Sequence, residues 1–159
     1  MPMTNRQHGW SLIEVLVAMA IFGIGLLGVA KLQMIGLHQT RSGYLRTQAD
    51  RMAYDMLDRM RVNRDIAASG GYDMTMRAQP PSGGATTDCD TTACTPDETR
   101  DFDRRRWLAN IRAMLPSGEG SISTTKHNSY SEVTVTVTWR KGTGANMTKR
   151  PSVTVRTML

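Results

Sequence analysis

The apolar residues of this chain gather near its N-terminus, and apolar positions then recur with a helical period. An uncharged apolar run extends from Val15 to Ala30. Beyond it, apolar side chains follow one another at spacings of three or four residues, at Leu45, Ala49, Met52, Met56 and Met60. We therefore predict a single long helix from about Trp10 to Asn63, about 80 Å in length. The breakers Ser69-Gly70-Gly71 are expected to end it.

The two sides of this predicted helix differ in character. Asp55 stands four residues before Arg59, and Asp58 stands three before Arg61, so the solvent side carries ion pairs that support the helix by a few tenths of a kcal/mol each, roughly. The methionine-rich stripe faces something apolar. Because methionine fills irregular gaps, we expect this stripe to pack against a sheet in the core.

A second, shorter helix is expected after a turn-rich stretch. Residues 79–95 are dense in Pro, Gly, Thr, Asp and Ser, which predicts a loop. Asp101 is expected to cap a helix that runs to Leu115, and Pro116 prevents its continuation. The inward-facing positions of this helix are Leu108, Ile111 and Leu115.

Strand patterns occupy the last third of the chain. Residues 132–140 alternate, with Val133, Val135, Val137 and Trp139 on one face and threonines on the other. A turn over 141–146 leads to a strand at 152–158, and an earlier strand is expected through 121–123. The pattern predicts an α+β fold in which a long N-terminal helix packs on a small antiparallel sheet through its valine face.

The composition of the chain bears on the compartment in which the protein works and on the ligands that it could bind. The chain has 159 residues and a net charge of +6, which describes association with anions or membranes more than mechanism. Its two cysteines, Cys89 and Cys94, lie close together, and a short disulfide loop there implies an oxidising compartment such as a bacterial periplasm. A zinc site needs about four ligands, and His8, His38 and His127 are distant in sequence.

The N-terminal segment has two interpretations. Met1 to His8 carries Arg6 and the terminal amine, as a secretory signal peptide does, and Gly28-Val29-Ala30 is an acceptable cleavage site after the apolar run. Glu14 argues against that signal, because a carboxylate within an apolar segment costs about 2.5–3.5 kcal/mol on insertion scales. Cleavage after Ala30 stays open as an alternative.

The run Gly9-Trp10-Ser11-Leu12-Ile13-Glu14-Val15-Leu16 resembles the class III signal of type IV prepilins. The resemblance implies that a prepilin peptidase cuts after Gly9 on the cytoplasmic face and methylates Trp10 as the new terminus, while the apolar segment is kept. Glu14 would then be the fifth mature residue. The family usually begins its mature chain with Phe and Thr, whereas this sequence has Trp and Ser.

A buried carboxylate needs a compensating positive group, and the amine of a neighbouring subunit in a filament would supply one to Glu14. The alternative is that Glu14 sits at headgroup depth.

The 21 residues from Trp10 to Ala30 suffice to cross a bilayer core of about 30 Å. Gly23, Gly25 and Gly28 either loosen the helix in a filament or are ordinary membrane-helix glycines. Lys31, Arg41 and Arg46 do not favour a cytoplasmic N-terminus, so orientation depends on the resemblance and the cysteines.

The run 115–120, Leu-Pro-Ser-Gly-Glu-Gly, placed after Asp101 and Trp107, resembles the C-terminal region of PilV-type minor pilins. This implies a minor pilin that primes assembly or forms the pilus tip and supports twitching motility or adhesion. Its partners would be prepilin peptidase, the major and other minor pilins, the assembly platform and inner-membrane lipid. The protein would cross the inner membrane once, with a periplasmic head, and then enter the pilus.

The expected organisation is a leader (1–9), a transmembrane and filament-core half-helix (10–30), an amphipathic half-helix (31–64), a loop with the disulfide (65–100), and a short helix with the sheet (101–159). Two other functions stay open: a minor pseudopilin of type II secretion, and DNA capture through Arg104, Arg105 and Arg106. Three consecutive arginines spread around a helix, so a solvated face is the simpler interpretation. No motif indicates an enzyme, a cofactor or a metal site.

Overall fold

The structure is a computed structural model that describes residues 11–80, 86–140 and 150–159. Its contacts divide the chain into two compact units, Met1–Arg41 and Ser42–Leu159. The long helix α1, Leu12–Val62, contributes residues to both units. In the described residues of the first unit, α1 is the regular element, and the second unit, called the head below, contains all the others.

The long helix is confirmed, and it ends one residue before the predicted Asn63, but the breakers at 69–71 do not end it. α1 stops at Val62, and a separate helix α2 follows at Arg64–Ala68. Between them Asn63 leaves the helical region, and its side-chain amide donates to the carbonyl of Pro96 (2.7 Å) and to the hydroxyl of Tyr72 (3.1 Å). The breakers 69–71 therefore end α2, where Gly70 takes a positive φ of 85°, a conformation that glycine adopts freely.

Four antiparallel strands form one sheet in the order β1-β2-β3-β4. The strands are β1 (Met74–Arg77), β2 (Glu119–Lys126), β3 (Ser131–Thr138) and β4 (Ser152–Met158). The strands expected at 121–123 and 152–158 are confirmed, and β3 ends two residues before the predicted Arg140. β1 was not predicted and lies within the segment expected to be a loop. The turn expected at 141–146 falls in a part of the chain that the structure does not describe.

The helix α3 spans Pro96–Met114 and begins five residues before the predicted cap. Thr95 is the N-cap: its hydroxyl accepts from the Glu98 backbone N–H, and its own backbone N–H donates to the Glu98 carboxylate at 2.9 Å, which completes a capping box. The prediction that Asp101 caps the helix is therefore wrong. Asp101 lies inside α3 and is buried.

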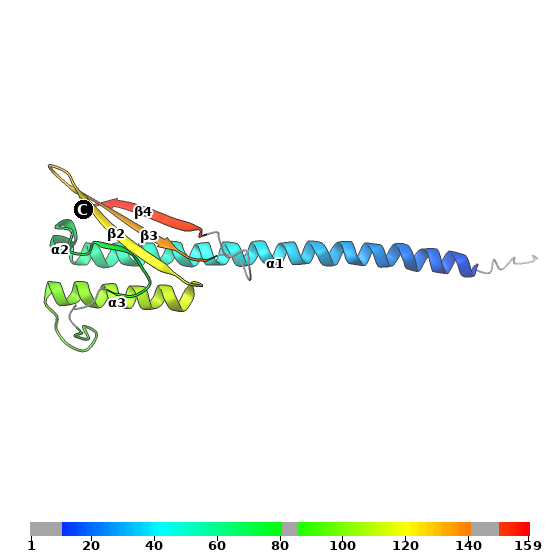
Figure 1. The fold of residues 1–159 in the computed structure, drawn as a ribbon, viewed down its shortest axis with the longest axis horizontal. Helices are drawn as coiled ribbons and strands as arrows, with labels where there is room; N and C mark the ends of the chain where they lie inside the picture. Colours follow the sequence, from blue (N-terminus) through cyan, green and yellow to red (C-terminus); the bar gives the residue numbers. More distant parts are fainter. Residues whose placement is uncertain (1–10, 81–85, 141–149) are drawn as a thin grey trace, which may run out of the picture. The chain divides into compact units, whose positions relative to one another are not determined.

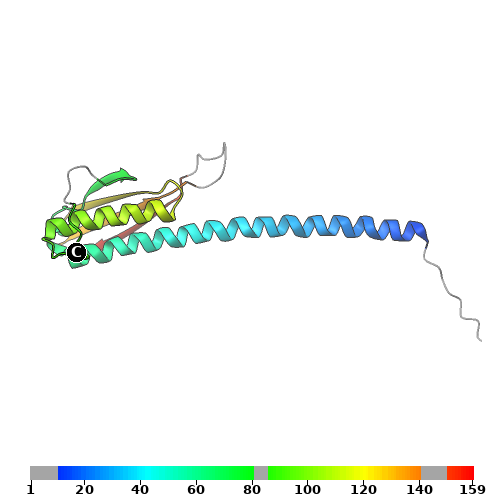
Figure 2. The ribbon, with the colours of Figure 1, turned by 90° about the horizontal axis from the view of Figure 1, so that it is seen from below.

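The core of the head lies where the last part of α1, α3 and the sheet meet (Figures 1 and 2). The predicted methionine stripe is confirmed, with Ala49, Met56 and Met60 fully buried and Leu45 and Met52 packed against the cluster. The predicted inward residues of α3 and the valines of β3 are fully or almost fully buried as well. Trp107 joins the two helices, because its indole N–H donates to the carbonyl of Met52 at 2.7 Å.

Candidate functional site

The acid singled out in the sequence lies in the first turn of α1. Glu14 is exposed, and its backbone N–H donates to the carbonyl of Ser11 at 2.9 Å. A carboxylate in this position is favoured by the partial positive charge of the helix N-terminus. Gly9 and Trp10, where cleavage and methylation are expected, lie outside the described residues.

The surface of α1 after Glu14 is apolar and open. Large side chains from Leu12 to Leu37 are exposed, among them Leu16, Ile21, Phe22, Leu27 and Leu32. An added Cβ at Gly23, Gly25 or Gly28 would meet nothing within 4 Å. Within the described part of the chain, α1 is the helix long and apolar enough to cross a membrane, a property that signal sequences and soluble core helices can share. Such a surface is stable in lipid or against other apolar helices.

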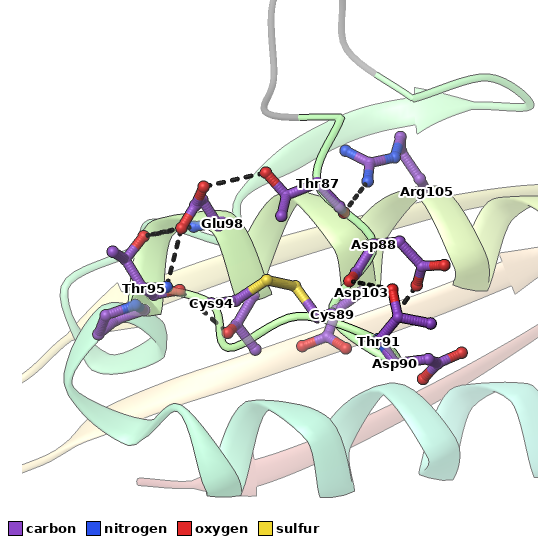
Figure 3. The surroundings of a disulfide bond; sticks show 12 residues. Thr87, Asp88, Cys89, Asp90, Thr91, Cys94, Thr95, Glu98, Asp103 and Arg105 are labelled. Carbon is purple, nitrogen blue, oxygen red and sulfur yellow. Dashed lines mark hydrogen bonds between the residues drawn. A yellow bond between two sulfur atoms is a disulfide. The ribbon is translucent and has the colours of Figure 1, made fainter.

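The two cysteines form the expected disulfide, Cys89–Cys94, in the loop that leads into α3 (Figure 3). The loop is held to the helix by polar contacts. The Thr87 hydroxyl donates to one Glu98 oxygen at 2.9 Å, while the Thr95 backbone N–H and hydroxyl donate to the other. These hydrogen bonds, led by the one from the Thr95 backbone, lower the pKa of Glu98 below its ordinary value. The loop that carries the disulfide and the N-terminal cap of α3 therefore share the Glu98 carboxylate as their hydrogen-bond acceptor.

The three consecutive arginines make contacts within the protein. Arg104 donates to Asp101 at 2.7 Å, Arg105 donates to the backbone carbonyl of Thr87 at 2.9 Å, and Arg106 donates to Asp90 at 2.5 Å. Arg105 and Arg106 also lie over the ring of Phe102. They tie the disulfide loop and the turn at Gly71 to α3, so the expectation of a solvated arginine face is wrong for Arg104, whose side chain is 12% exposed.

A buried polar cluster that the sequence did not reveal fastens α3 to the last turn of α1. Asp103 on α3 is 5% exposed and accepts from Arg59 of α1 at 3.0 Å and from the Tyr72 hydroxyl at 2.8 Å. Burial, together with the nearby charge of Asp103, raises the pKa of Tyr72. Arg59 also donates to Asp55 at 3.0 Å, which is one of the two predicted ion pairs, and Asp58–Arg61 is the other at 2.6 Å. The cluster links α1, α3 and the segment that leads into β1.

Two family models match the chain. Residues 4–30 match the prokaryotic N-terminal methylation motif, and residues 31–105 match the family described as Type IV pilin Tt1218. The chain is a type IV pilin-like protein. No curated protein and no solved structure matches it.

The methylation motif in this pilin implies processing by a prepilin peptidase and assembly with other pilins. A long N-terminal helix with a small antiparallel sheet is the pilin α+β fold, as predicted. The apolar first part of α1 fits a membrane-anchored pilin, and the family match indicates a structural protein. In the described residues no cluster of three or more His, Cys, Asp or Glu is placed to hold a metal ion.

Proposed function

We propose that this protein is a minor pilin of the PilV type, which primes assembly of a type IV pilus or sits at its tip. The observation that carries the proposal is the surface of α1, where an open apolar stretch contains one acid, Glu14, close to the methylation motif. A subunit that first rests in lipid and later packs against other helices needs such a surface. Twitching motility and adhesion are the activities that the pilus would serve.

The PilV assignment is favoured by the turn after α3. Ser117 has a positive φ of 48°, and an added Cβ at Gly118 would lie 2.6 Å from the Ile111 side chain and 2.8 Å from its carbonyl oxygen. Gly118 is therefore needed where the chain turns tightly from α3 into β2. This turn contains the sequence that resembles PilV-type minor pilins.

In the proposed pathway the leader, residues 1–9, stays in the cytoplasm, and the peptidase cuts between Gly9 and Trp10 and methylates Trp10. The mature protein crosses the inner membrane once, and its head lies in the periplasm, where oxidation of Cys89 and Cys94 is supported by the environment. Glu14 then pairs with the terminal amine of a neighbouring subunit. That pairing removes an uncompensated carboxylate from an apolar setting and fixes the axial position of the subunit.

Intact-mass measurement tests the processing step. Protein purified from cells that contain prepilin peptidase is expected to begin at Trp10 and to carry one added methyl group. Replacement of Gly9 by a bulky residue such as leucine is expected to leave the uncut precursor in the membrane. A mature chain that begins at Lys31 would show instead that the apolar segment is a conventional signal peptide.

Glu14→Ala tests assembly separately from anchoring. The variant is expected to be cut and inserted normally, because cleavage occurs at Gly9 and a more apolar helix inserts at least as well. Its amount in sheared pili relative to membranes is expected to fall about tenfold or more, since a buried charge contact is lost. Asp65→Ala, which removes an exposed acid from α2, is the matched control. Entry of Glu14→Ala into pili at the parental level would refute the proposed role of Glu14.

Deletion of the gene tests the assignment to a pilus. We expect fewer surface pili and reduced twitching, both restored by the intact gene, while export of folded proteins continues. Normal piliation combined with a defect in protein export would assign the protein to a type II secretion pseudopilus.

A further inference from the structure

An open cavity of about 630 Å³ lies at the β1 edge of the sheet, within the head. Its lining comes from three elements: Asp73, Thr75 and Arg77 in and before β1, Ser121 and Ser123 in β2, and Arg104 in α3. The volume falls within the range of small-molecule sites in proteins, about 300–1,000 Å³. The described lining of the cavity contains no residue of α1, on which the proposed assembly function depends.

A β-bulge turns Arg77 toward this cavity. Met74 pairs with Ile122 and Arg77 pairs with Gly120, so β1 advances three residues where β2 advances two. In a regular strand, Met74 and Arg77 would point to opposite faces of the sheet. The extra residue places Arg77 opposite Gly120, on the face where Gly120 meets Trp107 of α3. A bulge commonly redirects a side chain in this way. It brings Arg77 to the side of the sheet that carries Arg104.

Both guanidinium groups have unused hydrogen-bond donors. The Nε atoms of Arg77 and Arg104 are buried, and neither finds a partner among the described residues. The hydrogen bond shown for Arg77 goes to the neutral hydroxyl of Thr75 at 2.9 Å, and no described carboxylate lies within 4 Å of it. Arg104 shares the carboxylate of Asp101 with Arg100. Both guanidinium groups line one cavity, and the Arg77 bond shown above goes to a neutral hydroxyl, so an anion that enters the cavity can accept hydrogen bonds from them.

The charges of the lining favour a monoanion. Arg77 and Arg104 each contribute +1 and Asp73 contributes −1, so the lining side chains sum to +1. Asp73 would repel a dianion such as phosphate, while its exposed carboxylate can accept hydrogen bonds from hydroxyl groups. A planar carboxylate matches the fork of a guanidinium.

We propose that this cavity binds a hydroxylated monocarboxylate of the acidic-sugar class, with its carboxylate on Arg77 and Arg104 and its hydroxyl groups on Asp73. The ligand is a free uronic acid or the corresponding unit of an acidic polysaccharide. The site does not depend on the assignment to a pilus, and a failure of either proposal leaves the other standing.

Saturation-transfer NMR tests the site on the full-length protein in a sugar-free, uncharged detergent. Galacturonate is expected to bind, galactose to bind at least tenfold more weakly, and inorganic phosphate not to displace galacturonate. Trigalacturonate separates the two sources: affinity at least tenfold above that of galacturonate indicates a polysaccharide, and equal affinity indicates the single sugar. Either of these two results supports the site.

Arg77→Gln is expected to weaken galacturonate binding tenfold or more, whereas Arg156→Gln, which changes an exposed arginine on β4, is the matched control and leaves it unchanged. Circular dichroism checks that each variant is folded. If Arg77→Gln does not fold, Arg77→Lys keeps the positive charge but not the planar fork, and binding is expected to fall by less than tenfold but measurably. The proposal is overturned if galacturonate does not bind, if galactose binds equally well, if phosphate displaces galacturonate, or if the folded Arg77 variant binds like the parent.

Discussion

The contact between Gly120 of β2 and Trp107 of α3 offers a sharp test of how the sheet packs on the helices. A Cβ added at Gly120 would lie 2.4 Å from Cη2 and 2.5 Å from Cζ3 of the Trp107 ring. The ring is fully buried, and its hydrogen bond to the carbonyl of Met52 holds the opposite edge in place. Gly120→Ala therefore forces the sheet away from α3 or the indole out of its position.

The expected cost follows from this overlap. Overpacking of a filled core costs about 1–3 kcal/mol, so we expect the free energy of unfolding of Gly120→Ala to fall by about 2 kcal/mol. Trp107→Phe loses the hydrogen bond and part of the buried ring and is expected to cost about 2 kcal/mol as well. Phenylalanine lacks the outer ring atoms that meet residue 120. The double variant is therefore expected to be at least about 1 kcal/mol more stable than the sum of the two single effects.

Urea unfolding of the full-length protein in detergent micelles, followed by circular dichroism, gives these free energies. Gly43→Ala is the matched control, because a Cβ added there meets nothing within 4 Å and alanine favours a helix interior by up to about 1 kcal/mol. The control is expected to raise stability. Additive losses in the double variant, or a Gly120→Ala variant as stable as the parent, would show that the tight contact between β2 and α3 does not exist in solution.

Two further predictions concern the segment that leads into α3. Non-reducing peptide mapping should find Cys89 joined to Cys94, and two free thiols in protein from the periplasm would contradict this. The double variant Cys89→Ser with Cys94→Ser should lower the free energy of unfolding by about 2 kcal/mol, since the bridge closes a loop with a sequence separation of 5. The pKa of Glu98 is lowered in the folded protein, so its carboxylate stabilises the fold above its unfolded pKa, about 4.3, and that contribution is lost as the pH falls through the folded pKa. Urea midpoints measured from pH 6 to pH 3 should therefore fall less steeply in Glu98→Gln than in the parent, and parallel curves would refute the role of Glu98.

The elements that the sequence predicted best are those with a local periodic pattern. The stripe on α1, the inward positions of α3 and the alternating valines of β3 each repeat at the spacing of their own element, so burial follows from the pattern alone. The disulfide was predictable because Cys89 and Cys94 are the two cysteines of the chain and lie close together.

Missed features have two different causes. β1 has only four residues, too few for a clear strand pattern, and its burial does not alternate. It forms because it pairs with β2, more than 40 residues later in the chain, and no local pattern reports such a contact. The residues Thr95-Pro96-Asp97-Glu98 signal the start of α3 in the sequence, because they form a capping box with proline in the first helical position. The turn-rich residues before them obscured this signal.

The polar contacts of the head were also beyond the reach of the sequence. Asp103 meets Arg59 and Tyr72, which are 44 and 31 residues away along the chain, and its importance depends on burial that only the packed helices create. The arginines at 104–106 illustrate the same limit. Consecutive charges suggested a solvated face, which holds for the exposed Arg106 but not for Arg104, whose side chain lies beside Asp101.

The way the disulfide loop is fastened has a consequence for sequence divergence. Described residues 86–95 contribute nothing to the hydrophobic core; their contacts are the covalent bridge, the cap of α3 and hydrogen bonds from α3 side chains. Positions 90–93, enclosed by the bridge, can therefore change while the interior of the head stays the same. Apart from Asp90, which pairs with Arg106 of α3, this short segment can vary at the outer surface of the pilin, and in the laboratory it is a suitable place to insert a foreign peptide.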